Sequence, residues 1–163
     1  MLTRLEKLLY RLEAQHACLA FAFKDIADKP GPVFEIGLGH GRTFHHLRHH
    51  LAGREIFVFE RQVDSYPDCT PEANHILLGD IGTTLPEAAK RFAGQVVLAH
   101  SDIGTFEASH NQMMSGLVSS HLAPALAPGA LVLSDLPLSV PDTRPLPLPA
   151  GAKEGRYFIY RYR

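Results

Sequence analysis

The sequence has few cysteines and no long hydrophobic run, and these absences exclude several classes of protein. Its 163 residues include two cysteines, too few for a disulfide framework or a zinc knuckle. The longest apolar run near the start covers only residues 17–23, whereas a membrane-spanning helix needs about 20. Charged residues among the first leucines are also unlike a signal peptide. We therefore expect a cytoplasmic protein with no membrane partner.

The sequence also lacks an excess of charge of either sign. Lys and Arg number 16 and Asp and Glu number 17, which gives a net charge of −1. Because proteins that bind nucleic acids usually carry a basic surface, no nucleic-acid partner is expected. Hydrophobic residues make up 45% and charged residues 20%, as in a globular chain, which excludes a disordered or fibrous protein.

The length and the absence of repeats or linkers predict a single domain over residues 1–163, with three parts. Residues 1–28 form an amphipathic helix with a leucine stripe, residues 30–135 form the core, and residues 136–163 form a Pro-rich segment and a terminal strand. The stripe consists of Leu2, Leu5, Leu9, Leu12 and Leu19. We expect it to pack on the core; the alternatives are a homodimer seam or a lid over a site.

Short apolar segments alternate with helical segments through the core. The predicted strands are residues 33–36, 56–59, 75–78, 95–99 and 129–134. Because these strands are apolar throughout rather than alternating, both faces of the sheet must be covered. A last strand at residues 156–162 suits an edge or antiparallel position. The predicted fold is α/β, a Rossmann-like three-layer sandwich with a mainly parallel sheet, helices on both faces and an antiparallel last strand.

Polar residues follow several of these strands, where ligands bind in open parallel sheets. They are Glu60, Asp80, His100, Ser101, Asp102 and Asp135. The first strand runs instead into a glycine turn at residues 37–41, where the backbone can bend sharply and a ligand can approach closely. The helix that follows favours an anionic group at its start. A carboxylate at Glu60 can accept both hydroxyls of a ribose, so these features predict a nucleoside-containing cofactor; the alternative is a turn that only tightens packing.

The spacing of the glycines is G-x-G-x-G rather than the G-x-G-x-x-G of dinucleotide-binding proteins. Residues 33–41 resemble the first motif of class I S-adenosylmethionine-dependent methyltransferases of the small stand-alone type. Residues 56–60 are similar to their second motif, residues 79–81 to their third, and residues 126–132 to the segment leading into their fifth strand.

The resemblance implies a role for each matching residue. The backbone of Gly37, Leu38, Gly39, His40 and Gly41 would hold the methionine part of S-adenosyl-L-methionine, with Glu35 near its amino group. Glu60 would bind the ribose, and Arg61, Asp80 and Ile81 would surround the adenine. His100 and Ser101 would line the cleft near the sulfonium.

The expected reaction is transfer of the methyl group to a small-molecule acceptor. If the acceptor must lose a proton, His100 or Asp102 is the candidate catalytic base; the alternative is that each only supports a loop. Asp135 and His100 fall near the metal ligands of catechol-type enzymes, but Leu136 replaces an Asn, so no metal is expected. Two other functions remain open: an NAD-dependent oxidoreductase and a non-catalytic S-adenosylmethionine-binding protein.

Several histidines and methionines carry weaker signals. His45, His46, His49 and His50 form two i, i+4 pairs, which can bind metals, but we expect a solvated helix face. His110 is predicted to be structural, and the pair Met113-Met114 is predicted to fill the core.

Overall fold

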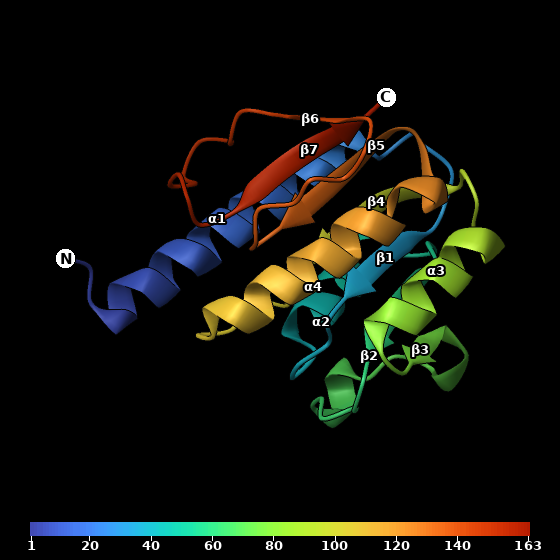
Figure 1. Ribbon diagram of the computed structural model, residues 1–163, viewed down its shortest axis with the longest axis horizontal. Coiled ribbons are helices and arrows are strands. Elements are labelled where there is room, and N and C mark those ends of the chain that lie inside the picture. The colour runs from blue at the N-terminus through green and yellow to red at the C-terminus, as the bar shows by residue number, and fades with distance from the viewer.

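A seven-stranded sheet forms the middle layer of the computed structural model, which describes residues 1–163 (Figure 1). The strand order is β3-β2-β1-β4-β5-β7-β6, so the order reverses between β1 and β4. β1 to β5 are parallel, whereas β7 pairs antiparallel with β5 and β6. The strands are β1 Val33–Ile36, β2 Ile56–Glu60, β3 Ile76–Leu78, β4 Val96–Ser101, β5 Leu126–Ser134, β6 Thr143–Pro145 and β7 Phe158–Tyr162.

Four α-helices cover the two faces of the sheet. They are α1 Arg4–Asp25, α2 Arg42–His50, α3 Ile81–Arg91 and α4 Ala108–His121; short 3-10 helices occupy Pro67–Cys69, Ala73–His75 and Ala123–Ala125. α3 and α4 pack on one face through a core that includes Phe34, Phe59 and Leu85. α1 and α2 pack on the other face through a core that includes Leu47 and Val58. This confirms the predicted three-layer α/β fold and its antiparallel last strand. No helix has the length and apolar character needed to cross a bilayer.

Two predicted boundaries are wrong, and one strand was not predicted. β4 continues through His100 and Ser101, which pair with Glu35 and Ile36 of β1, so these two residues belong to the strand. α3 begins at Ile81 rather than at residue 84, because the Asp80 carboxylate accepts the Gly82 N–H and caps the helix. The Pro-rich segment contains the edge strand β6, which the sequence analysis did not predict.

The leucine stripe of α1 does not pack on the core as expected. Leu5 is 75% exposed, and Leu2, Leu9 and Leu12 are exposed as well; Leu19 alone of the stripe is buried. α1 extends beyond the sheet at its N-terminal end (Figure 1), so the first half of the helix has no apolar surface to cover. A capping box between Thr3 and Glu6 stabilises this free end. The homodimer seam stays a prediction, since the leucines are open to a partner.

Asp25, at the end of α1, connects this helix to β7 through an ion pair with Arg161. Its carboxylate accepts two hydrogen bonds from the Arg161 guanidinium, both at 2.8 Å, and one from Lys29 at 2.7 Å. The Arg161 hydrogen bonds, with help from Lys29, hold the pKa of Asp25 below its usual range. Asp25 therefore stabilises the fold above the ordinary carboxyl pKa, and this contribution is lost as the pH falls through the lowered value.

We expect Asp25→Asn to lower the free energy of unfolding by about 1 kcal/mol at neutral pH, because a bidentate and half-buried ion pair loses its charge. Chemical denaturation should show this difference shrinking as the pH falls below the ordinary carboxyl pKa, and vanishing below the lowered pKa, where Asp25 is protonated and as neutral as Asn. Asp142→Asn is the matched control, since the Asp142–Arg163 pair is 3.9 Å apart and exposed. Equal losses in both variants, or a loss independent of pH, would contradict this role for Asp25.

Candidate functional site

A cleft of about 450 Å³ lies at the carboxyl ends of β1, β2 and β3, beside the point where the strand order reverses. This is where open parallel sheets bind their ligands. Seven of the predicted site residues line it: Gly37, Gly39, Glu60, Arg61, Asp80, Ile81 and Asp102. The topology therefore gathers residues that are up to 65 positions apart in the sequence (102 − 37) around one cavity.

The three glycines of the turn have two different structural roles. All three adopt positive φ angles, 93° at Gly37, 51° at Gly39 and 85° at Gly41. A Cβ atom at Gly37 would lie 2.8 Å from the Asp102 carbonyl oxygen, and one at Gly41 would collide with the Cys69 carbonyl. A Cβ at Gly39 would meet nothing within 4 Å. Gly37 and Gly41 thus allow close packing, whereas Gly39 leaves open space on the cleft side.

Glu60 connects the second strand to the glycine turn. One carboxylate oxygen accepts the N–H groups of Leu38 and Gly39, at 3.0 and 3.2 Å. The other accepts the N–H of Arg61 at 2.7 Å. The side chain is therefore held at the rim of the cleft, with its charge next to the turn.

Asp80 and Ile81 form the third side of the cleft. One oxygen of Asp80 caps α3 at 2.8 Å from the Gly82 nitrogen, and the second carboxylate oxygen has no protein partner. Asp80 is exposed, while Ile81 is buried against the sheet. This arrangement leaves one acceptor facing solvent at the cleft.

α4 supplies an apolar wall that the sequence analysis missed. His110, Met113, Met114 and Leu117 line the cleft from one helix face. Met113 is 55% exposed, so the prediction that it fills the core is wrong. The spacing i, i+3, i+4 and i+7 was visible in the sequence, but it does not say whether the apolar face meets a core or a ligand.

Three predicted site residues lie elsewhere. Glu35, His100 and Ser101 are all at most 1% exposed and do not line the cleft. Glu35 and His100 are paired neighbours on β1 and β4 whose side chains point to the face covered by α1. The Ser101 hydroxyl is buried without a hydrogen-bond partner. His100 in this position cannot touch a ligand in the cleft, which separates it from the catalytic role predicted for it.

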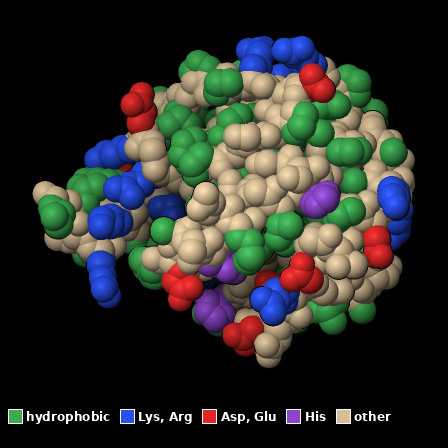
Figure 2. All heavy atoms as spheres, viewed as in Figure 1, with side chains coloured by type: hydrophobic (Ala, Val, Ile, Leu, Met, Phe, Trp, Pro, Cys, Tyr) green, Lys and Arg blue, Asp and Glu red, His purple; other side chains and the backbone are tan.

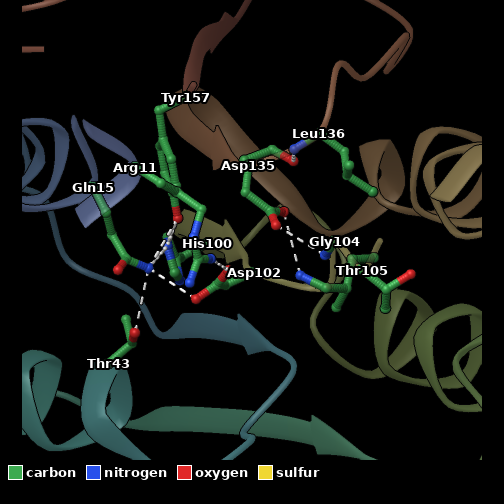
Figure 3. A network of polar contacts seen from close by, with 12 residues as sticks. Arg11, Gln15, Thr43, His100, Asp102, Gly104, Thr105, Asp135, Leu136 and Tyr157 are labelled. Atoms are coloured by element: carbon green, nitrogen blue, oxygen red, sulfur yellow. Dashed lines mark hydrogen bonds and ion pairs between the residues drawn. The ribbon is translucent and has the colours of Figure 1, made fainter. Parts of the chain in front are cut away.

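His100 is instead the centre of a buried polar network (Figure 3). Its Nδ1 lies 2.7 Å from the Glu35 carboxylate, and its Nε2 contacts the Tyr157 hydroxyl. Burial raises the pKa of Glu35 to about 7, although the His100 ring opposes this shift. Burial alone would lower the pKa of His100, but the Glu35 carboxylate outweighs it and the pKa is raised. Each group therefore shifts the pKa of the other in favour of its charged form.

Arg11 and Gln15 of α1 link this network to the rim of the cleft. Arg11 donates to one oxygen of Asp102 at 2.7 Å, and the Gln15 amide donates to the other at 3.0 Å (Figure 3). Asp135 accepts the Gly104 N–H at 2.8 Å and so holds the loop after β4. Burial, with the nearby Asp102 charge, raises the pKa of Asp135 to about 6. Arg11 and Gln15 could not be predicted as site residues, because an i, i+4 polar pair on a helix gives no indication of the partner that it contacts.

The remaining predicted residues support the turn from outside the cleft. The Leu38 side chain is buried in the core beneath α1 and α2. His40 is exposed, stacks on Tyr66 and contacts the Asp64 carbonyl oxygen through Nδ1.

The histidines of α2 are packed more closely than expected: His46 is half-buried, and its ring centroid lies 4.4 Å from that of His50. No group of three or more His, Cys, Asp or Glu side chains is placed to hold a metal ion.

Comparison with known proteins gives a family and a fold. The sequence model of the S-adenosyl-L-methionine methyltransferase family matches residues 2–162. The chain is similar to an S-adenosyl-L-methionine methyltransferase from Silicibacter pomeroyi DSS-3, with 44% identity, a TM-score of 0.96 and 100% of both chains covered. No sequence among curated proteins matches it.

Two more distant structures share the fold. TrmN from Thermus thermophilus has 15% identity and a TM-score of 0.62, with 94% of this chain and 52% of that chain covered. MycE of the mycinamycin biosynthetic pathway, solved with Mg and SAH, has 16% identity and a TM-score of 0.52, with 79% and 34% covered. At this level of identity they support the architecture of the sheet and its helices.

The geometry of the turn predicts unequal effects of adding one methyl group. Gly37→Ala should lower the free energy of unfolding by about 2–4 kcal/mol, through a strained φ and a clash with the loop after β4. Gly39→Ala should cost only about 1 kcal/mol, because its Cβ enters open space and only the φ is strained. Gly116→Ala, in α4 and also facing open space, should raise stability slightly. Denaturation curves that rank Gly39→Ala as the most damaging would contradict this division.

Proposed function

This chain belongs to the S-adenosyl-L-methionine methyltransferase family, and from that premise we propose that it methylates a small-molecule acceptor bound beside the glycine turn. The enzyme class and the cofactor expected from the motifs are confirmed by the family match and by the 44% identical methyltransferase. The same findings favour methyl transfer over the NAD-dependent oxidoreductase and the non-catalytic binding protein. The acceptor and the role of each residue are our proposal.

The cleft fits S-adenosyl-L-methionine in shape and in charge. Gly39 lines the cleft, and because a Cβ atom there would meet nothing within 4 Å, its backbone is open to a ligand. Glu60 and Asp80 supply carboxylates to a cofactor that carries a sulfonium and an ammonium. A volume of about 450 Å³ lies within the range of pockets that bind small molecules. The presence of the open Gly39 and of the Glu60 and Asp80 carboxylates in one cleft is the observation on which the proposal rests.

In this proposal, each side of the cleft contacts a different part of the cofactor. Glu60, held by the N–H groups of the turn, accepts the ribose hydroxyls. The unpartnered oxygen of Asp80 accepts from the adenine amino group, while Met113 and Leu117 of α4 pack on the face of the ring. The cofactor supplies an electrophilic methyl group. The protein therefore contributes alignment of the acceptor and an electrostatic setting, not activation of the donor.

Asp102 is the one predicted catalytic residue that lines the cleft. Both of its oxygens are hydrogen-bonded, to Arg11 and to Gln15, so the carboxylate is fixed in position. Asp102 in this setting can orient the acceptor from the strand end, next to the Gly37 backbone. His100 acts only through its buried contacts and not on the acceptor.

We expect Glu60→Gln to weaken binding of S-adenosylmethionine and S-adenosylhomocysteine by about tenfold or more, equivalent to about 1–3 kcal/mol, because a charged acceptor of the ribose hydroxyls is lost. Titration calorimetry measures this directly. Glu87→Gln, on the exposed face of α3, is the matched control and should bind as the native protein does. Unchanged affinity in the Glu60 variant would reject the ribose-binding role.

A transfer assay tests the small-molecule acceptor. With labelled methyl donor and a cell extract, the label should appear in the fraction that passes a small-pore filter, because the cleft has the size of a metabolite pocket. The Glu60 variant should lower this label in proportion to its loss of affinity. Label retained with RNA or protein would contradict a small-molecule acceptor while leaving the methyltransferase activity in place.

A further inference from the structure

A second cleft, of about 670 Å³, opens beside the cofactor cleft. The two share the backbone of Gly104 and Thr105, so a molecule in the second cleft reaches the rim of the first. α1 forms one wall, and the segments after β4, after β5 and before β7 form the others. This is the position from which an acceptor could enter.

Four cationic side chains surround the second cleft. Arg4, Lys7 and Arg11 occupy positions i, i+3 and i+7 of α1, which share one helix face. Arg156, from the segment before β7, lines the same cleft. Figure 2 shows Lys and Arg side chains gathered along the protruding part of α1, beside the body of the protein. The cationic face of α1, rather than its leucine stripe, therefore turns toward the second cleft.

Three of these cations have no anionic partner. Arg11 pairs with Asp102 at 2.7 Å, but Arg4, Lys7 and Arg156 form no ion pair. Like charges on adjacent turns of a helix repel each other. Since the whole chain has a net charge of −1, this concentration of positive charge is a local feature.

Asp135 is the one acidic residue that lines this cleft. Its two oxygens accept N–H groups from Ile103 and Gly104, at 3.3 and 2.8 Å, so it is engaged with the loop after β4. Arg4 and Lys7 of α1 are therefore left available to a ligand, whereas Arg11 is paired with Asp102.

The cleft also has apolar groups at its rim. Leu8 and Leu136 line it, and the Phe106 ring is fully exposed there. A ligand that matches both features carries an anionic group on a partly apolar body.

We infer that this second cleft binds the methyl acceptor, and that the acceptor is a small organic molecule bearing a phosphate or a carboxylate. The inference rests on the proposed methyl transfer and adds the chemical class of the substrate. Guanidinium groups bind both kinds of oxyanion in a bidentate manner. The volume suits a metabolite-sized ligand, and the balanced overall charge is unlike that of a nucleic-acid-binding protein.

Binding of simple anions tests the inference without knowledge of the natural acceptor. Phenyl phosphate and benzoate serve as the phosphate and carboxylate probes, and neutral benzamide as the control ligand, each titrated into the protein with and without S-adenosylhomocysteine. We expect at least one of the anions to bind and benzamide not to bind. The double variant Lys7→Gln, Arg156→Gln should weaken anion binding by about tenfold or more, because two charge-assisted contacts are lost.

The matched control is Lys90→Gln, Arg144→Gln, which removes the same charge from exposed positions away from the cleft. It should bind both anions within about twofold of the native protein, since distant exposed charges are largely screened. Equal weakening in the two double variants, or no binding of either anion, would overturn the inference. Charge-dependent binding of a single-stranded oligoribonucleotide without binding of the small anions would overturn it in favour of RNA.

Calorimetry with S-adenosylhomocysteine separates this inference from the proposed function. Neither double variant changes a residue of the cofactor cleft, so both should bind S-adenosylhomocysteine as the native protein does. A native protein that bound the anions but not S-adenosylhomocysteine would sink the proposed function and leave the anion site standing.

Discussion

The alternation of side chains along β1 and β4 decides which polar groups of this protein reach the ligand. The two strands are parallel neighbours at the point where the strand order reverses, with Glu35 opposite His100. Because successive side chains point to opposite faces, Glu35 and His100 both turn toward α1. The cleft is lined by Ile36 at the end of β1, by Gly37 directly after it and by Asp102 directly after β4. A shift of one residue in the pairing would exchange the buried network for the groups that face the cleft.

The buried network makes α1 part of the site. Polar groups without water must satisfy one another, and Gln15 lies within hydrogen-bond distance of Asp102 and Tyr157. Arg11 then places a guanidinium on Asp102 at the rim of the cleft. At its other end, α1 is held by Asp25 and Arg161. The helix therefore has a defined position, and the cations on its free half stand at a fixed place beside the cofactor cleft.

Much of the fold could be predicted from the chain. Apolar segments such as Ile56–Phe59 and the glycine turn indicated a covered parallel sheet and a ligand at its edge, and the motifs at Glu60 and Asp80 led to the family. The predictions failed where a tertiary contact overrides a local pattern. His100 looked like a residue beyond a strand because its polarity interrupts the apolar run, yet Glu35 and Tyr157 satisfy it inside the core. Met113 looked like core filler because periodicity does not distinguish a core from a ligand-binding wall.

The order of the core strands and helices, the glycine turn and the carboxylates at the ends of the second and third strands could be predicted, because each follows from residue type and spacing within a few positions. Most leucines of the α1 stripe face solvent and the cations of α1 line the second cleft, and only the packing of distant segments produces this outcome. The same packing places the His100 side chain between the sheet and α1, while Asp102 lies at the cleft. These outcomes depend on which surfaces meet when distant segments pack, and hydrophobic spacing along one helix or strand does not contain that information.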